Sequence, residues 1–319
     1  MIRSRTGAFR MKYTVAPGLY SIGGPDSDSD VFVSANYKLS FDILRRELKG
    51  INAWILVLDT KSINVWCAAG KGTFSADEII KRISETQLDR KVSHRRLIVP
   101  QLGAVGVNAH SVQKATGFRV HFGPVQAKDI NAYVNAGYKK TEEMSAIRFN
   151  MLDRLVLTPM EINPMMKKFP MYSLIVLLIF GLQPSGIMFR DAWLGGMPFL
   201  VLGLIAIFAG AFLTPVLLPF IPSRSFALKG WITGLLAIML STKFLGMPDH
   251  EDLMLLVAAY LFFPLASSYI ALQFTGSTTF TGISGVKKEL KIGVPIYIFG
   301  VVLSLVLLLV HKLVEWRTI

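Results

Sequence analysis

Cys67 is the residue whose type and surroundings offer the most chemistry. It is the only cysteine among 319 residues and stands in the run Asn-Val-Trp-Cys-Ala-Ala-Gly-Lys, residues 64–71. One cysteine excludes an intramolecular disulfide, a CxxC redox pair and a cysteine-ligated iron–sulfur cluster within this chain. A thiolate can be a metal ligand, but a lone cysteine is also often a small buried apolar residue. The residue types alone leave both interpretations open.

The surroundings of Cys67 favour a ligand site. The apolar run Ala53–Asp59 predicts a buried parallel strand, and ligands of open α/β sheets bind beyond the carboxyl ends of such strands. Asn64 predicts a helix N-cap and Gly70 the residue just past the helix end. Cys67 would then lie near the positive end of a short helix, with Lys71 close by, and both features favour the thiolate.

The neighbours of Cys67 suggest a flat partner. Ala68, Ala69 and Gly70 are small enough to let a planar macrocycle approach the backbone, and Trp66 offers an aromatic wall. Thr60 at the strand end and Asn36 are further candidates for the rim of such a site. His110 and His121 are alternative axial ligands in principle, although a lone histidine is more often a hydrogen-bonded structural residue.

The first half of the chain predicts an α/β domain with a Rossmann-like parallel sheet. Strands and helices alternate along it, which is typical of layered α/β folds. The expected strands are 31–34, 53–59, 97–100, 119–122 and 155–157, and the expected helices 41–48, 75–86, 110–116 and 127–136. Ser75, with Glu78 three residues later, predicts a capping box. The sequence shows no GxGxxG, Walker or HExxH motif and no cluster of metal-type ligands, which disfavours a nicotinamide or nucleotide enzyme.

The second half predicts an all-α membrane domain. The composition changes at residues 166–170, so we expect a soluble domain over 1–168 and a transmembrane domain over 169–319. About 20 mostly apolar residues cross a bilayer, and the five candidate helices are 171–189, 197–221, 226–245, 253–274 and 292–314. They are nearly free of ionisable residues, which favours an anchor over a transporter.

The net charge of +13 is explained largely by the membrane half. Positive residues flank the apolar spans, where they set topology and meet anionic headgroups, so nucleic-acid binding is disfavoured. With the first domain inside, the inner connections carry more of them than the outer ones. This predicts a multi-pass protein of the cytoplasmic (inner) membrane, with a cytoplasmic N-terminal domain and an external C-terminus. The N-terminal basic residues 3, 5, 10 and 12 precede no apolar segment and predict no secretory signal.

The run 64–71 resembles the signature of the HgcA family, the membrane corrinoid proteins of microbial mercury methylation. The segments Ala35-Asn-Tyr-Lys-Leu-Ser-Phe-Asp42 and Arg154-Leu-Val-Leu-Thr-Pro159, with the five-span tail, extend this resemblance over nearly the whole chain. The first domain is also similar to the corrinoid-binding domain of the corrinoid iron–sulfur protein large subunit. The resemblance implies a cobalamin-type corrinoid bound base-off, with the Cys67 thiolate as the lower axial ligand of cobalt.

The resemblance also implies an activity and its partners. The expected reaction is methyl transfer to Hg(II), giving methylmercury, with the methyl group leaving as a carbanion equivalent or a radical. The expected partners are HgcB, a ferredoxin-like [4Fe–4S] protein that acts as reductant, and a folate-type methyl donor system. Two alternatives remain: a membrane-bound methyl carrier of one-carbon metabolism, and a non-enzymatic transporter or scaffold in which Cys67 is merely buried.

Overall fold

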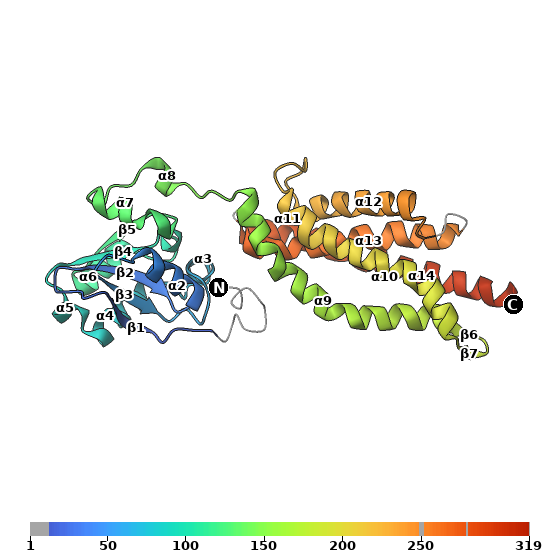
Figure 1. Cartoon of the computed structure of the whole chain (residues 1–319), viewed down its shortest axis with the longest axis horizontal. Helices are drawn as coiled ribbons and strands as arrows, with labels where there is room; N and C mark the ends of the chain where they lie inside the picture. The colour runs from blue at the N-terminus through green and yellow to red at the C-terminus, as the bar shows by residue number, and fades with distance from the viewer. Residues whose placement is uncertain (1–12, 249–251, 279, 319) are drawn as a thin grey trace. The chain divides into compact units, whose positions relative to one another are not determined.

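The computed structural model describes residues 13–248, 252–278 and 280–318, and it divides the chain into two compact units (Figure 1). The first unit ends at Arg148 and the second begins at Phe149, earlier than the break expected near residue 168. The difference arises because residues 151–168, expected in the soluble domain, belong to a helix that continues into the first apolar span. The N-terminal basic residues 3–12 lie outside the described part of the chain.

A five-stranded sheet forms the centre of the first unit, with the order β1-β3-β2-β4-β5. Strands β2 to β5 are parallel, as expected, and β1 pairs antiparallel with β3 at the edge. The sequence interpretation missed β1. The strands are β1 Gly18–Ile22, β2 Asp30–Ala35, β3 Ala53–Leu58, β4 Arg96–Val99 and β5 Arg119–Phe122.

Helices cover both faces of this sheet and make it a three-layer α/β unit. Alternate residues of β2 point to opposite faces, so Val31 and Val33 join one core and Phe32 the other. Helices α4 and α6 pack on the first core, and α2 and α7 on the second. The helical elements are α2 Lys38–Glu47, α3 Val65–Gly70, α4 Ala76–Thr86, α5 Leu88–Lys91, η2 Gln101–Gly103, α6 Ala109–Thr116, η3 Ala127–Asp129, α7 Ile130–Asn135 and α8 Glu142–Ser145.

The strand order reverses between β2 and β4. From β2 the chain passes through α2 to β3 on one side, and from β3 it passes through α3 and α4 to β4 on the other side of β2. The connections that follow β2 and β4 therefore diverge to opposite faces of the sheet. In open α/β sheets, the crevice at such a reversal is where ligands bind.

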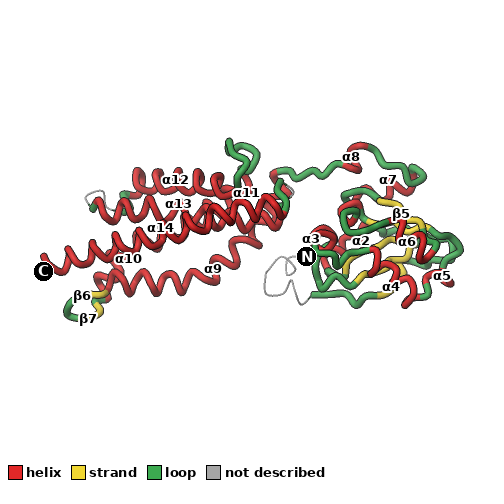
Figure 2. Tube along the Cα trace, turned by 180° about the vertical axis from the view of Figure 1, so that it is seen from behind, coloured by secondary structure: helices red, strands yellow, loops and turns green. Residues whose placement is uncertain are grey.

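The second unit is helical, and five of its helices are long and apolar enough to cross a membrane. Figure 2 shows them as one bundle, joined at one turn by the small hairpin β6 Leu182–Gln183 and β7 Gly186–Ile187. The elements are α9 Met151–Gly181, α10 Phe189–Phe208, η4 Ala209–Leu213, α11 Thr214–Val216, α12 Phe226–Leu245, α13 Leu253–Gln273, η5 Phe274–Ser277 and α14 Ile283–Thr318. The five spans were expected, and the bounds of α12 agree with the expectation.

The first, second and last spans differ from the expectation. The second runs over Phe189–Val216, so it begins and ends earlier than the expected 197–221. Helix α9 begins at Met151 and continues through Pro159, Pro164 and Pro170, so the strand expected at 155–157 is wrong. Prolines interrupt helices less in packed membrane bundles, because neighbouring groups satisfy the freed carbonyls. Helix α14 is likewise longer at both ends than the expected 292–314.

The helices of the second unit also carry more buried charge than expected. The Arg154 guanidinium donates to the Val216 carbonyl at 3.1 Å, and the Lys229 ammonium donates to the carbonyls of Leu218 and Ile221. These carbonyls lie where the α10–α11 helix ends before α12, a place where cations satisfy unpaired acceptors. Both charges therefore have a structural role.

Close packing of α12 on α13 depends on two glycines spaced four residues apart. A Cβ on Gly230 would lie 2.4 Å from the Ala271 Cβ, and one on Gly234 would lie 2.6 Å from the Ser267 Cβ. This is the small-xxx-small spacing that lets membrane helices approach closely. The resulting contact holds α12 against α13 along its first half.

A buried carboxylate joins three elements of the first unit. Asp30, which begins β2, accepts a hydrogen bond from Arg96 Nη2 of β4 at 2.7 Å. The Tyr138 hydroxyl, which follows α7, lies 3.0 and 2.9 Å from the two Asp30 oxygens. The Arg96 guanidinium also lies 4.2 Å from the centroid of the Tyr138 ring. Charge, hydrogen bonding and ring contact thus fix the amino ends of β2 and β4.

Replacing Tyr138 by Phe removes the hydroxyl and keeps the ring under Arg96. We expect the free energy of opening of the β2 and β4 amides to fall by about 2 kcal/mol, because a hydrogen bond to a charged group is lost. Hydrogen exchange of the full chain measures this. Tyr20→Phe is the matched control, since its hydroxyl donates only to the exposed Ala16 carbonyl. Equal effects of the two variants would contradict the assigned role of Tyr138.

Candidate functional site

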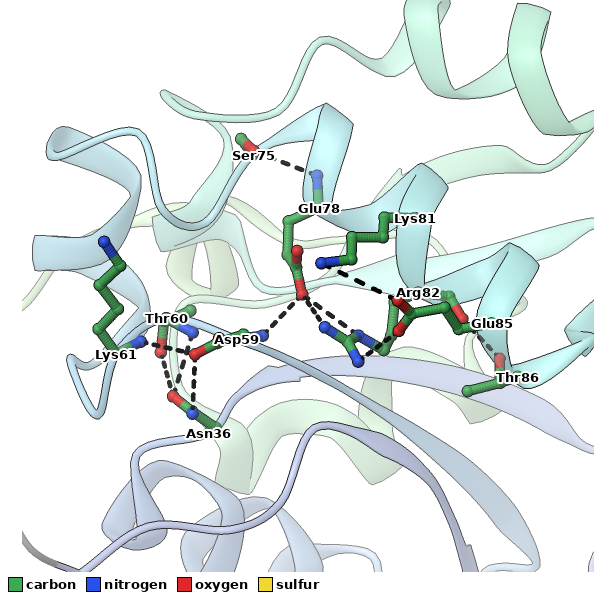
Figure 3. A network of polar contacts seen from close by, with 10 residues as sticks. All are labelled: Asn36, Asp59, Thr60, Lys61, Ser75, Glu78, Lys81, Arg82, Glu85 and Thr86. Carbon is green, nitrogen blue, oxygen red and sulfur yellow. Dashed lines mark hydrogen bonds and ion pairs between the residues drawn. The ribbon is translucent and has the colours of Figure 1, made fainter.

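The loop after β3 is held by the side chain of Asn36, at the end of β2 (Figure 3). Its Oδ1 accepts the backbone N–H groups of Thr60 at 3.1 Å and Ser62 at 3.0 Å, while its Nδ2 donates to Asp59 Oδ1 at 3.2 Å. The Thr60 hydroxyl lies 2.8 Å from the same Oδ1 and 2.7 Å from the Ile63 carbonyl. Asn36 is 6% exposed and Thr60 is fully buried. These two residues, expected at a cofactor rim, instead clamp the loop from within.

The clamp holds an unusual backbone. Lys61 and Ser62 both have positive φ, at 54° and 61°, which is uncommon for residues with side chains. The Lys61 N–H donates to Asp59 Oδ1 at 3.1 Å, so the turn is bonded on both sides of Thr60. The chain is thereby redirected from the end of β3 into α3.

Helix α4 adds a second attachment to the end of β3 (Figure 3). The Ser75 hydroxyl accepts the Glu78 N–H at 3.3 Å, which confirms the predicted N-cap. The Glu78 carboxylate accepts the Asp59 N–H at 2.9 Å and also pairs with Arg82 at 2.6 Å. Glu78 was expected to bond back to Ser75 in a capping box, and its carboxylate bonds the Asp59 N–H and Arg82 instead.

Helix α3 begins where the sequence predicts. The Asn64 Oδ1 accepts the Cys67 N–H at 2.9 Å, which makes Asn64 the N-cap. The end of the helix differs, because Gly70 is its last helical residue and Lys71 its C-cap. The left-handed backbone conformation, at a φ of +75°, occurs at Gly72. The expectation that Gly70 lies just past the helix end was therefore wrong.

The two sides of α3 have different environments. Val65, Ala68 and Ala69 are buried in the core, whereas Trp66 and Cys67 are half-buried and Gly70 is exposed. A Cβ on Gly106 would lie 3.0 Å from the Ala69 Cα and 2.2 Å from the Phe74 carbonyl oxygen. Close packing of the segment after β4 against α3 thus explains glycine at position 106. Ala68 and Ala69 lie on the buried side of α3.

A cavity of about 330 Å³ lies beside the start of α3, at the reversal of strand order. Its lining is mainly apolar. It comes from β2, α2, the amino end of α3, the carboxyl end of β4 and the segment that follows it, the loop after β5, and the first residues of η3 and α7. Asn64, Val65 and Trp66 contribute to the lining, and Cys67 is the next residue. Among the described residues, no hydrogen bond involves the Cys67 thiol, which is free and half-buried.

The segment after β4 contributes an exposed apolar residue that the sequence interpretation missed. Val105 is 85% exposed, between Gly103 and Gly106, and Gly106 packs against Ala69 of α3. Leu102, at the start of the same segment, lines the cavity. The pair of glycines three apart after a predicted strand was the available signal for a tight turn at this edge.

The other predicted candidates lie apart from the cavity lining. His110 is an exposed residue of α6, and His121 of β5 contacts the Tyr138 ring at 6.5 Å between centroids. Partial burial, together with the Arg96 and Arg119 guanidiniums, holds the pKa of His121 below its usual value. Within the described ranges, no group of three or more His, Cys, Asp or Glu could hold a metal ion.

The N-terminal domain is similar in sequence to known proteins. Residues 9–134 match the family model described as CO dehydrogenase/acetyl-CoA synthase delta subunit, CdhD. The gamma subunit of the acetyl-CoA decarbonylase/synthase complex of Archaeoglobus fulgidus is 32% identical over 135 residues, which are 42% of this chain and 28% of that protein. The corrinoid/iron-sulfur protein large subunit of Moorella thermoacetica is 32% identical over 120 residues, 37% of this chain and 26% of that protein.

The chain thus spans little more than a quarter of the length of these relatives. The matched segment contains the whole sheet, the Asn36 clamp, α3 and most of the cavity lining. The N-terminal unit is therefore similar to the CdhD family and to part of the corrinoid/iron-sulfur protein large subunit.

Proposed function

We propose that the N-terminal domain binds a corrinoid and that the protein is a membrane-anchored corrinoid methyl carrier. The observation that carries this proposal is the position of Cys67, which directly follows the residues of α3 that line the cavity at the strand-order reversal. The domain's relatives include a protein named for its corrinoid and subunits of an acetyl-CoA decarbonylase/synthase complex. Their names support a methyl-transfer role in one-carbon metabolism.

The exposed side of α3 fits a flat cofactor. Gly70 lies three residues after Cys67, hence on the same side of the helix. A Cβ built on Gly70 meets nothing within 4 Å, and its φ does not require glycine. The fold therefore gives no reason for glycine at this position, whereas close approach of a planar ligand does. The exposed Val105 and the half-buried Trp66 add apolar surface suited to a macrocycle.

In this proposal Cys67 is the lower axial ligand of cobalt in a base-off corrinoid. A bound corrinoid would supply a cobalt centre that accepts and donates a methyl group, and a soft thiolate would increase its electron density. Asn64 fixes the backbone of Cys67, and Val65, Trp66 and the exposed Lys71 complete its surroundings. Asn36 and Thr60 are positioning residues, because they hold the loop from which α3 starts.

The proposed carrier needs partners for two steps, the supply of the methyl group and the reduction of the cobalt. A carrier of this kind needs a folate-type methyl donor and a reductant that restores the cobalt. A ferredoxin-like [4Fe–4S] protein such as HgcB would serve as the reductant. The five apolar helices would anchor the domain in the cytoplasmic membrane, with the domain on the cytoplasmic side and the C-terminus external, as the distribution of positive charge favours.

A second, narrower proposal is that the methyl acceptor is Hg(II). It rests on the run 64–71, which resembles the HgcA signature, and on the chemistry of its thiol. Mercuric ion is electrophilic, so it must receive the methyl group with its bonding electrons or as a radical. A strongly donating thiolate below the cobalt eases that departure, whereas the ordinary transfer of a methyl cation would not serve Hg(II).

Replacing Cys67 by Ala tests the axial ligand. The full-length wild-type protein, reconstituted anaerobically with cobalamin, is expected to retain the corrinoid and to show an absorption spectrum that differs from that of the variant. The difference arises because the axial ligand changes the electronic transitions of the macrocycle. Identical spectra would contradict the axial role of Cys67. Failure of the wild type to retain any corrinoid would contradict the proposed carrier function and favour a scaffold.

Replacing Gly70 by Leu tests the approach of the macrocycle. We expect corrinoid retention to fall, because the new side chain would stand beside Cys67. Folding stability should not fall, since the site is open and glycine is a weak helix former by about 0.5–1 kcal/mol. Gln113→Leu, which adds the same side chain to an exposed position of α6, is the control. Retention unchanged in the Gly70 variant would exclude close approach at this position.

The mercury proposal is tested by the product formed from Hg(II), a methyl donor and a reductant. Wild type should form methylmercury, Cys67→Ala should form none, and Cys67→Thr should be severely impaired because a hydroxyl is a harder and weaker donor. Mass spectrometry of methylmercury measures this. Full activity of the Thr variant would refute the thiolate mechanism. Methyl transfer by wild type to another acceptor but not to Hg(II) would refute mercury as acceptor and leave the carrier function intact.

A further inference from the structure

A groove in the second unit lies between α12 and α14. Both helices pack on α13, and their facing sides enclose a space of about 580 Å³. Leu265 and Ser268 of α13 form its floor. Figure 2 shows these three helices side by side within the bundle. One end of the groove lies near the amino ends of α12 and α14. From there the groove continues along the apolar sides of the two helices.

The two ends of the groove differ in chemistry. One end is lined by two exposed cations, Arg224 just before α12 and Lys288 in the second turn of α14. Further along, its walls are apolar and include aromatic rings. They are formed by Leu228, Trp231, Leu265, Ile292, Ile296 and Tyr297. Several of these side chains also face outward: Leu228 is 47% exposed and Ile296 is 50% exposed. The groove is thus open to the medium that surrounds the helices.

The one carboxylate of the groove is already bonded. The Glu289 Oε2 accepts the Ser225 hydroxyl at 2.7 Å and the Ala227 N–H at 2.8 Å, and its Oε1 accepts the Phe226 N–H at 3.1 Å. Its charge is therefore turned to the amino end of α12, where anions are stabilised. Among the described residues no ion pair involves Arg224 or Lys288. The mouth of the groove consequently has two cations available for an external anion.

We infer that this groove binds an anionic phospholipid of the surrounding bilayer. The phosphate would lie between Arg224 and Lys288, and an acyl chain would follow the apolar wall toward Ile296. Basic residues at the end of a groove between membrane helices are the arrangement that recognises acidic headgroups. Trp231 lies in the second turn of α12, near the cations, and aromatic side chains in such positions favour the membrane interface. A neutral lipid would lack the attraction at the mouth, and a free phosphate would lack the contact with the wall.

The test compares lipids retained by the full-length protein purified in mild detergent. Native mass spectrometry after incubation with an equimolar mixture of phosphatidylglycerol and phosphatidylcholine should show preferential retention of phosphatidylglycerol. Arg224→Gln with Lys288→Gln should weaken this retention roughly thirtyfold, since each cation near a headgroup contributes roughly fivefold. Gel filtration and circular dichroism establish that the variants are folded.

The matched control is Lys287→Gln with Lys291→Gln, which removes the same number of charges from exposed positions of α14 outside the groove lining. It should retain phosphatidylglycerol as wild type does. Equal loss in the control, or retention unchanged in the groove variant, would overturn the assignment. Inorganic phosphate that displaces phosphatidylglycerol at equal concentration would show a free-anion site and would also overturn it.

Discussion

The side-chain amide of Asn36 is the interaction on which the candidate site depends. Its oxygen accepts two backbone N–H groups of the loop after β3, and its nitrogen reaches the Asp59 carboxylate. With Asn36 nearly buried, losing this side chain would leave those donors unpaired away from water, which is costly. Asn36 stands at the carboxyl end of β2, so it ties two neighbouring parallel strands to the start of α3. The position of Cys67 is a consequence of this clamp and of the Asn64 cap.

The two sides of α3 have different roles. Val65, Ala68 and Ala69 anchor it in the core, and the close approach of the Ala69 backbone leaves no space for a side chain at Gly106. Cys67 and Gly70 are on the other side, where nothing in the fold demands their identities. Where the fold does not explain a residue's identity, ligand binding is a candidate explanation. This distinction separates the glycines by role: Gly72 supplies a positive φ, Gly106 supplies close packing, and Gly70 has no such role in the fold.

Local signals in the sequence were sufficient for much of the fold. The Asn64 and Ser75 caps, the strand at Ala53–Leu58 and the bounds of α12 depend on neighbouring residues and were predicted. Features that depend on residues distant in the sequence were not predicted. Helix α9 continues through three prolines, which a local pattern reads as breaks, and the Glu78 side chain bonds the distant Asp59 N–H and not its own cap. The roles of Asn36 and Ala69 likewise depend on residues more than twenty positions away. Cobalt and mercury come from resemblance, and no residue pattern alone would have named them.

The most direct test of the central proposal is X-ray absorption at the cobalt edge of the full-length protein reconstituted with cobalamin. Thiolate ligation by Cys67 predicts one sulfur atom in the first coordination shell of cobalt, and that sulfur should be absent in the Cys67→Ala variant. A first shell of nitrogen, oxygen and carbon atoms only, identical in the two proteins, would contradict it.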